Sequence, residues 1–144
     1  MITVRDWLVS DLDRITEIEQ ASFSDPWSRQ MIEGVMSAFN FKGLVIEEAG
    51  RVEGYVGASY VLDEGEILLV AVDSPKRGKG YGKTLVQSLL DFYEKNGVKK
   101  VFLEVRRSNQ CAISCYEACG FEKIAERARY YSDGEDAIIM EKKI

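Results

Sequence analysis

One segment of the sequence constrains the fold more than any other. An uninterrupted apolar run at residues 67–72 is followed by a glycine-rich stretch at 77–82 and then by a helical pattern at 83–96. A continuous apolar run of this length is typical of a strand covered on both faces. Gly97 ends the helix, whose inner stripe consists of Leu85, Leu89, Leu90 and Tyr93. We therefore expect a sheet with other elements packed on both sides.

Shorter elements before and after this segment predict a mixed α+β architecture. Ser10 and Asp13 have the spacing of a capping box, which favours a helix from there to about Phe23. Other helices are expected around residues 31–36 and 109–119, and strands at 2–5, 44–47, 52–62, 101–106, 121–129 and 137–141. No repeat or linker divides the 144 residues, so we expect a single domain spanning residues 1–144.

The chain contains no histidine. This excludes Ser-His-Asp and Cys-His nucleophiles, the His-Glu-x-x-His zinc site and any imidazole general base. If the protein is an enzyme, carboxylates, tyrosines, cysteines and backbone amides must carry out its chemistry.

The charge balance argues against a nucleic-acid partner. The net charge is −5, from 19 basic and 24 acidic residues, and no basic run is longer than two residues. A basic partner suits this surface better. The apolar runs are too short to span a bilayer and the N-terminus lacks a signal-peptide pattern, so we expect a cytoplasmic protein without a membrane partner.

Three cysteines, Cys111, Cys115 and Cys119, recur every four residues and therefore share one helix face. A metal site is disfavoured because the usual two-residue spacings and a fourth ligand are missing. We expect no metal here and interpret the cysteines as buried, inert residues that act as small hydrophobes.

The stretch Arg77-Gly78-Lys79-Gly80-Tyr81-Gly82-Lys83-Thr84 fits neither a P-loop nor a dinucleotide fingerprint, because the glycines of both motifs fall at other spacings. Glycines between a buried strand and a helix nevertheless let successive backbone N–H groups converge at the helix N-terminus. A phosphate or pyrophosphate is the ligand that this geometry suits. The alternative is a loop that only reverses the chain.

The same stretch matches the Q/R-x-x-G-x-G/A signature of the GNAT acyltransferase superfamily, and other segments extend the resemblance over nearly the whole chain. Residues 70–73, 103–106, 108–109, 116–117 and 120–121 resemble N-terminal acetyltransferases, and residues 25–28, 130–131 and 133–140 resemble their ribosomal-protein-alanine branch. The resemblance implies a GNAT fold: a central, mostly antiparallel, twisted sheet, splayed at its middle strands and flanked by about four helices. It also implies acetyl-CoA as cosubstrate and the N-terminus of a protein, by analogy a ribosomal protein, as acceptor.

The resemblance also implies site residues. Glu104 matches the family's base, and strand alternation places it with Phe102 on the face opposite Val101, Leu103 and Val105. Tyr116 matches the acid that assists the departing thiolate. The implied acetyl-CoA contacts are Val70, Ala71, Val72, Arg77, Gly78, Lys79, Gly80, Tyr81, Gly82, Lys83 and Asn109, and the implied acceptor pocket is Trp27, Tyr130 and Tyr131. Asn109 fits a helix N-cap equally well.

The acceptor can also be weighed from acid-base chemistry. An α-amino group has a pKa of about 7.7–8.0, whereas a lysine side chain has a pKa of about 10.4. An enzyme must therefore lower the pKa of a lysine by ~2.5 units, or roughly 3.5 kcal/mol, before the lysine loses its proton as easily. A chain without histidine is therefore better suited to N-terminal amines. Three alternatives stay open: an enzyme for small-molecule amines or protein lysines, a CoA-binding module without turnover, and a nucleotide-binding protein.

Overall fold

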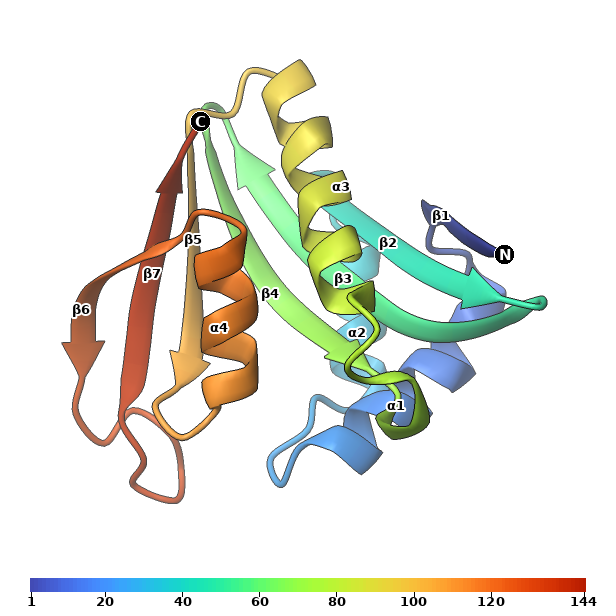
Figure 1. Cartoon of the computed structure of the whole chain (residues 1–144), viewed down its shortest axis with the longest axis horizontal. Coiled ribbons are helices and arrows are strands. Elements are labelled where there is room, and N and C mark those ends of the chain that lie inside the picture. The colour runs from blue at the N-terminus through green and yellow to red at the C-terminus, as the bar shows by residue number, and fades with distance from the viewer.

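The computed structural model describes all 144 residues and contains one seven-stranded sheet in the order β1-β2-β3-β4-β5-β7-β6 (Figure 1). The strands are β1 (Ile2–Asp6), β2 (Phe41–Glu48), β3 (Arg51–Val61), β4 (Glu64–Val72), β5 (Lys100–Arg106), β6 (Glu122–Arg127) and β7 (Ala137–Lys143). The helices are α1 (Leu12–Ser22), α2 (Arg29–Met36), α3 (Tyr81–Lys95) and α4 (Gln110–Ala118). Helices α3 and α4 cover one face of the sheet, and α1 and α2 lie on the other. The predicted α+β architecture is confirmed, and no helix is long and apolar enough to cross a membrane.

The sheet opens between β4 and β5. These two strands form its one parallel pair, and they are paired only from Glu64↔Lys100 to Ile67↔Leu103. Beyond Leu103 the strands diverge, so that the sheet has the outline of a V in Figure 1. The prediction of a mostly antiparallel sheet splayed at its middle strands is confirmed. One edge of residues 68–72 therefore carries no strand partner.

A β-bulge in β4 explains how an unbroken apolar run covers both faces. Gly57 pairs with Leu69, whereas Ala58 pairs with Ile67, so one residue of β4 is inserted between them. Ile67 consequently packs in the core under α3 and α4, but Leu69 packs in the core under α1. Without the bulge, residues two apart would face the same side.

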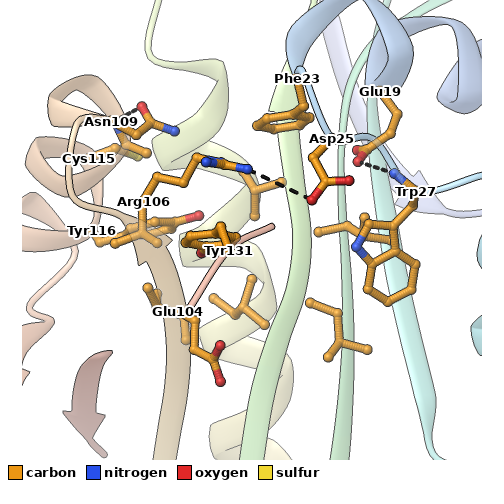
Figure 2. A pocket seen from close by; sticks show the side chains of 17 residues that line it. Glu19, Phe23, Asp25, Trp27, Glu104, Arg106, Asn109, Cys115, Tyr116 and Tyr131 are labelled. Atoms are coloured by element: carbon orange, nitrogen blue, oxygen red, sulfur yellow. Dashed lines mark hydrogen bonds and ion pairs between the residues drawn. The ribbon is translucent and has the colours of Figure 1, made fainter. Parts of the chain in front are cut away.

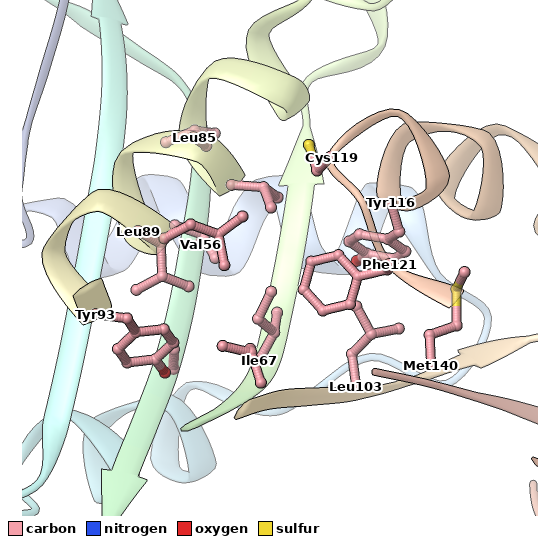
Figure 3. Packing of buried hydrophobic residues seen from close by; sticks show 14 of the residues in the cluster. Val56, Ile67, Leu85, Leu89, Tyr93, Leu103, Tyr116, Cys119, Phe121 and Met140 are labelled. Carbon is pink, nitrogen blue, oxygen red and sulfur yellow. The ribbon is translucent and has the colours of Figure 1, made fainter. Parts of the chain in front are cut away.

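The larger core lies between the sheet and helices α3 and α4 (Figure 3). The predicted inner stripe of α3 supplies Leu85, Leu89 and Tyr93, all with no exposed side-chain surface, and Tyr116 of α4 packs edge-on against Phe121. This layer packs α3 and α4 against the two arms of the V, and the N-terminal ends of both helices therefore lie toward its open end.

The smaller core, under α1 and α2, is built around Trp7. Its indole donates a hydrogen bond to the carbonyl of Leu44 (2.9 Å) and packs edge-on against Phe41. A Cβ at Gly43 or Gly57 would come within 2.8 Å or 3.1 Å of the indole ring. The small residues of β2 and β3 therefore provide the space that the tryptophan fills.

The helix that leads to the site does not begin as predicted. A 3-10 turn (Val9–Asp11) precedes α1, and the carboxylate of Asp11, not a Ser10–Asp13 capping box, accepts the N–H of Leu8 (2.7 Å). The capping-box prediction is therefore wrong, although the helix ends at Ser22 as expected. The helix predicted around residues 31–36 is confirmed as α2, and the Ser28 hydroxyl caps it by accepting the N–H of Met31 (3.2 Å).

Candidate active site

A cavity of about 250 Å³ lies where β4 and β5 diverge (Figure 2). Its walls come from five parts of the chain: the end of α1 with the α1–α2 segment, residues 67–70 of β4, the end of β5, α4 and the β6–β7 loop. The lining side chains labelled in Figure 2 are Glu19, Phe23, Asp25, Trp27, Glu104, Arg106, Asn109, Cys115, Tyr116 and Tyr131. The opening of the sheet thus brings together residues that are far apart in the sequence.

Glu104 lies on β5 just past the last residue paired with β4. Val101, Leu103 and Val105 are buried under the helices, which confirms the predicted alternation, and Glu104 is on the other face. Its carboxylate acts on its neighbours: it is the main cause of the raised pKa of Tyr130, and it adds to the effect of burial in raising the pKa of Glu66. Leu103 and Glu104 also line a second cavity of about 380 Å³.

Tyr116 reaches the cavity from α4, on the face of the sheet that α3 and α4 cover. Only 7% of the residue is exposed, and its hydroxyl has no hydrogen-bond partner within the chain. Burial, and then the nearby Cys115, raise the pKa of the phenol above its ordinary value. Tyr116 therefore stays protonated at neutral pH and can donate a hydrogen bond into the cavity.

The glycine-rich stretch carries a continuous set of backbone donors. None of the N–H groups of residues 78–83 donates a hydrogen bond within the chain, because α3 begins at Tyr81 and its first turn has no intrahelical acceptor. Gly78 (φ +80°) and Gly80 (φ +82°) adopt the left-handed backbone that turns these groups toward the helix N-terminus. Consecutive free donors at a positive helix end suit a phosphate or pyrophosphate.

The side chains of this stretch point elsewhere. The Tyr81 hydroxyl donates to Glu48 (2.6 Å). The Arg77 guanidinium donates to the carbonyl of Val72 (2.9 Å) and to the hydroxyl of Ser22 (3.1 Å). The Arg77 side chain thus connects the loop to the ends of β4 and α1, and its predicted contact with the cosubstrate stays a prediction. Lys79 lies on the exposed surface of the loop.

The unpaired edge of β4 supplies two further donors. The N–H of Asp73 donates to the carbonyl of Glu53 on β3 (2.8 Å), so alternation directs the N–H of Ala71 toward β3 as well. The N–H groups of Val70 and Val72 consequently face the opening. Of the three β4 residues expected to contact the cosubstrate, Ala71 has its backbone paired with β3 and its side chain buried in the Trp7 core, whereas the backbone of Val70 and Val72 faces the opening.

The predicted acceptor residues are only partly brought together. Trp27 and Tyr131 line the cavity from opposite loops. Tyr130 does not line it; it is exposed, lies near Glu104 and packs edge-on against Tyr131. The N-cap interpretation of Asn109 is confirmed, since its side-chain oxygen accepts the N–H of Ala112 (3.2 Å). The residue also lines the cavity, and its contact with the cosubstrate stays a prediction.

Sequence reasoning missed Glu19, a buried carboxylate at the cavity wall. It accepts hydrogen bonds from the Tyr55 hydroxyl and from the backbone N–H of Trp27 (3.0 Å), and burial raises its pKa. Its position was readable: Glu19 follows Ile15 by four residues, so a carboxylate occupies the apolar stripe of α1. Arg106 and Asp25 were missed as well.

The cysteines are not uniformly buried. Cys119 is buried, Cys111 is exposed and Cys115 lines the cavity, which corrects the prediction that all three are inert core residues. A hydrogen bond from Cys119 and the positive charge of Lys83 lower the pKa of Cys115 to about 7. Its sulfur lies beside the first turn of α3, 3.7 Å from the position of a Cβ at Gly82.

A sheet splayed beside a loop of free N–H groups, with a carboxylate and a phenol at the opening, defines an acetyltransferase of the GNAT class. The family model described as "Acetyltransferase (GNAT) family" matches residues 12–121, and the chain belongs to this family.

Several individual members of this family are similar to the chain over nearly its whole length. The chain is 35% identical over 143 residues to the [ribosomal protein bS18]-alanine N-acetyltransferase of Escherichia coli K12, covering 97% of this chain and 96% of the relative. The crystal structure of the ribosomal-protein-S18-alanine N-acetyltransferase from Escherichia coli has a TM-score of 0.93, covering 100% of this chain and 94% of that one. The structure of Ard1 from Thermoplasma volcanium is 31% identical, with a TM-score of 0.93 and coverage of 99% and 97%.

Proposed function

We propose that this protein is an N-α-acetyltransferase that transfers the acetyl group of acetyl-CoA to the N-terminal amine of a protein. One observation carries the proposal: Glu104 and Tyr116 approach the same cavity from opposite faces of the sheet, at the point where β4 and β5 separate. A proton acceptor and a proton donor on opposite sides of one opening match the two proton movements of acyl transfer from a thioester to an amine.

The backbone supports acetyl-CoA as the donor, which supplies the acetyl group as a thioester. The N–H groups of residues 78–83 would hold the pyrophosphate. The N–H groups of Val70 and Val72 would bind the acetyl carbonyl oxygen and stabilise the negative charge that develops on it. Cys115, Asn109 and Ala112 would line the path between these two groups of donors.

Glu104 would take the proton of the acceptor amine, directly or through one water molecule, as the new N–C bond forms. Tyr116 would donate a hydrogen bond to the sulfur as the C–S bond breaks. The raised pKa of Tyr116 makes full proton transfer less favourable, so hydrogen bonding would be the larger part of its role. Direct attack by the amine is favoured over an acyl-cysteine route because Glu104 and Tyr116 at the opening can supply both proton movements without a covalent intermediate on Cys115.

The acceptor is proposed to be a protein N-terminus, with a ribosomal protein as the candidate suggested by the names of the relatives. Trp27 and Tyr131 would limit the size of the first residue. The net charge of −5 favours a basic acceptor segment.

The proposal is tested by incubating the protein with acetyl-CoA and peptides that begin with Ala, Ser, Met or Glu, with thiol release and mass spectrometry as readouts. We expect one acetyl group on the α-amine of at least one peptide. Two control acceptors, a polyamine and a peptide whose N-terminus is blocked but which contains lysine, separate the alternatives. Acetylation of a control alone, or CoA binding without thioester cleavage, would contradict the proposal.

A further inference from the structure

Arg106 lies at the end of β5, on the rim of the cavity between Tyr116 and Asp25 (Figure 2). Only 18% of its side chain is exposed. The guanidinium stacks on the Tyr131 ring, 4.1 Å from the ring centroid. The same side chain donates to Asp133 (2.9 Å) and to Glu135 (3.0 Å), both in or beside the β6–β7 loop. Arg106 thus contacts three neighbours from the β6–β7 side of the cavity.

The fourth neighbour is on another element. Nη2 of Arg106 lies 3.8 Å from the carboxylate of Asp25, in the segment between α1 and α2. The Ser132 hydroxyl donates to the same carboxylate (3.3 Å), which gives a second contact between the two loops. These loops carry Trp27 and Tyr131, the opposite walls of the cavity. The ion pairs therefore join the walls across its rim.

We propose that Arg106 is a positioning residue that sets the width of the acceptor pocket and thereby selects for a small first residue. The inference rests on the proposed function. Arg106 holds Tyr131 firmly through the stack and two short ion pairs, and holds the opposite loop through the longer pair with Asp25. The pair with Asp25 is the longest of the three ion pairs, so the α1–α2 segment is the side that moves when a bulky residue enters.

A lysine could not replace this arrangement. The planar guanidinium can stack on the Tyr131 ring while its separate nitrogens pair with carboxylates on both loops, whereas an ammonium is a point charge on a flexible stem. Charge alone would therefore restore little of the selectivity. This distinguishes positioning by shape from a general effect of positive charge near the site.

The activity test compares peptides that differ only in their first residue, Ala or Met. We expect R106Q to raise KM for the Ala peptide, to change kcat less, and to lower the Ala-over-Met ratio of kcat/KM by about tenfold. R106K should behave like R106Q, and D25N should cause a partial loss. R107Q is the matched control, because Arg107 is the next residue but pairs with Glu126 outside the cavity. A wild type without Ala-over-Met preference, or equal losses for both peptides in R106Q, would overturn the inference.

A second readout needs no turnover. Hydrogen exchange should become faster in R106Q at residues 23–28 and at residues 129–136 together, whereas R107Q should leave residues 23–28 unchanged. If the wild type acetylates no peptide, the proposed function is wrong. If the two loops do not respond together to R106Q, the link between them is wrong, whatever the activity.

Discussion

The buried carboxylate of Glu19 accepts a hydrogen bond from the backbone N–H of Trp27 at 3.0 Å, which ties helix α1 to the loop that forms one wall of the cavity. The second carboxylate oxygen accepts the hydroxyl of Tyr55, on β3. Two donors from different elements thus converge on a single group inside the Trp7 core. We therefore expect both the stability of the fold and the shape of the cavity to depend on this carboxylate.

We predict that Glu19→Ala lowers the free energy of unfolding by about 2–4 kcal/mol, because it leaves the Tyr55 hydroxyl and the Trp27 N–H without a partner. Urea unfolding near neutral pH measures the loss. Glu17→Gln is the control, since Glu17 is in the same helix but is mostly exposed. A loss no larger than that of the control would contradict the assignment.

The same residue predicts a pH dependence. Burial raises the pKa of Glu19 in the folded state, so protons are bound more tightly there than in the unfolded chain. The stability that this contributes is fully present below the unfolded pKa, about 4.3, and is lost as the pH rises through the higher folded pKa. Glu19→Gln cannot titrate, so the wild type should lose stability relative to this variant across that interval. Urea unfolding at several pH values checks the sign, and a difference that is constant with pH would refute it.

The sequence predicted what depends on local pattern. Three predictions rest on patterns of a few residues: the strand at residues 67–72, the glycines before a helix and the short helix around residues 31–36. Each is present in the structure. The family resemblance added the splay of the sheet, which no local pattern encodes. Glu104 and Tyr116 were found because their segments match the family's motifs.

The missed features depend on residues distant in the sequence. Arg106 gains its role from Asp25 and Asp133, 81 residues before it and 27 residues after it. The bulge between Ile67 and Leu69 could not be read because an unbroken apolar run has no alternation for a bulge to interrupt. The sequence shows Arg77 as a cation next to the loop, but it does not show the carbonyl of Val72, which the Arg77 side chain contacts.

A substitution at Gly80 tests the backbone geometry of the glycine-rich stretch. An alanine there would have no steric contact within 4 Å, but it would have to adopt φ +82°. We predict that Gly80→Ala loses about 1–2 kcal/mol of unfolding free energy and binds CoA more weakly, since relief of the strain turns the N–H groups away. Thermal unfolding and calorimetric titration with CoA measure the two effects.

Gly34 provides the matched control, because it lies within α2 and a Cβ there meets nothing within 4 Å. Gly34→Ala should gain roughly 0.5–1 kcal/mol and leave CoA affinity unchanged. If the two alanine variants show the same changes in unfolding free energy and CoA affinity, the left-handed conformation at Gly80 is not required for CoA binding.

Cys115 should be the most reactive thiol of the chain. Its pKa is lowered to about 7 by the hydrogen bond from Cys119 and by Lys83, so a large share is thiolate near neutral pH. We predict that iodoacetamide alkylates Cys115 before Cys119, whose pKa is raised, and that acetyl-CoA slows the reaction. Lys83→Gln should also slow it. Exposed Cys111 serves as the internal control, and equal protection of Cys111 by acetyl-CoA would contradict the placement of Cys115 in the cosubstrate path.

The two proposed proton-transfer residues should fail in different ways. Glu104→Gln keeps the shape of the side chain but cannot accept a proton, so we expect kcat to fall by about 10²–10⁴ while the affinity for acetyl-CoA is unchanged. Tyr116→Phe removes only the donor to the sulfur, and we expect a loss of about 10² that is smaller when the leaving thiol is more acidic. Tyr93→Phe, a change of the same size at a residue that lines neither cavity, should keep full activity. A group that acts only in proton transfer does not change the affinity of the protein for acetyl-CoA. Loss of acetyl-CoA binding in Glu104→Gln or Tyr116→Phe would therefore contradict the proposed role of that residue and make it part of the cosubstrate site.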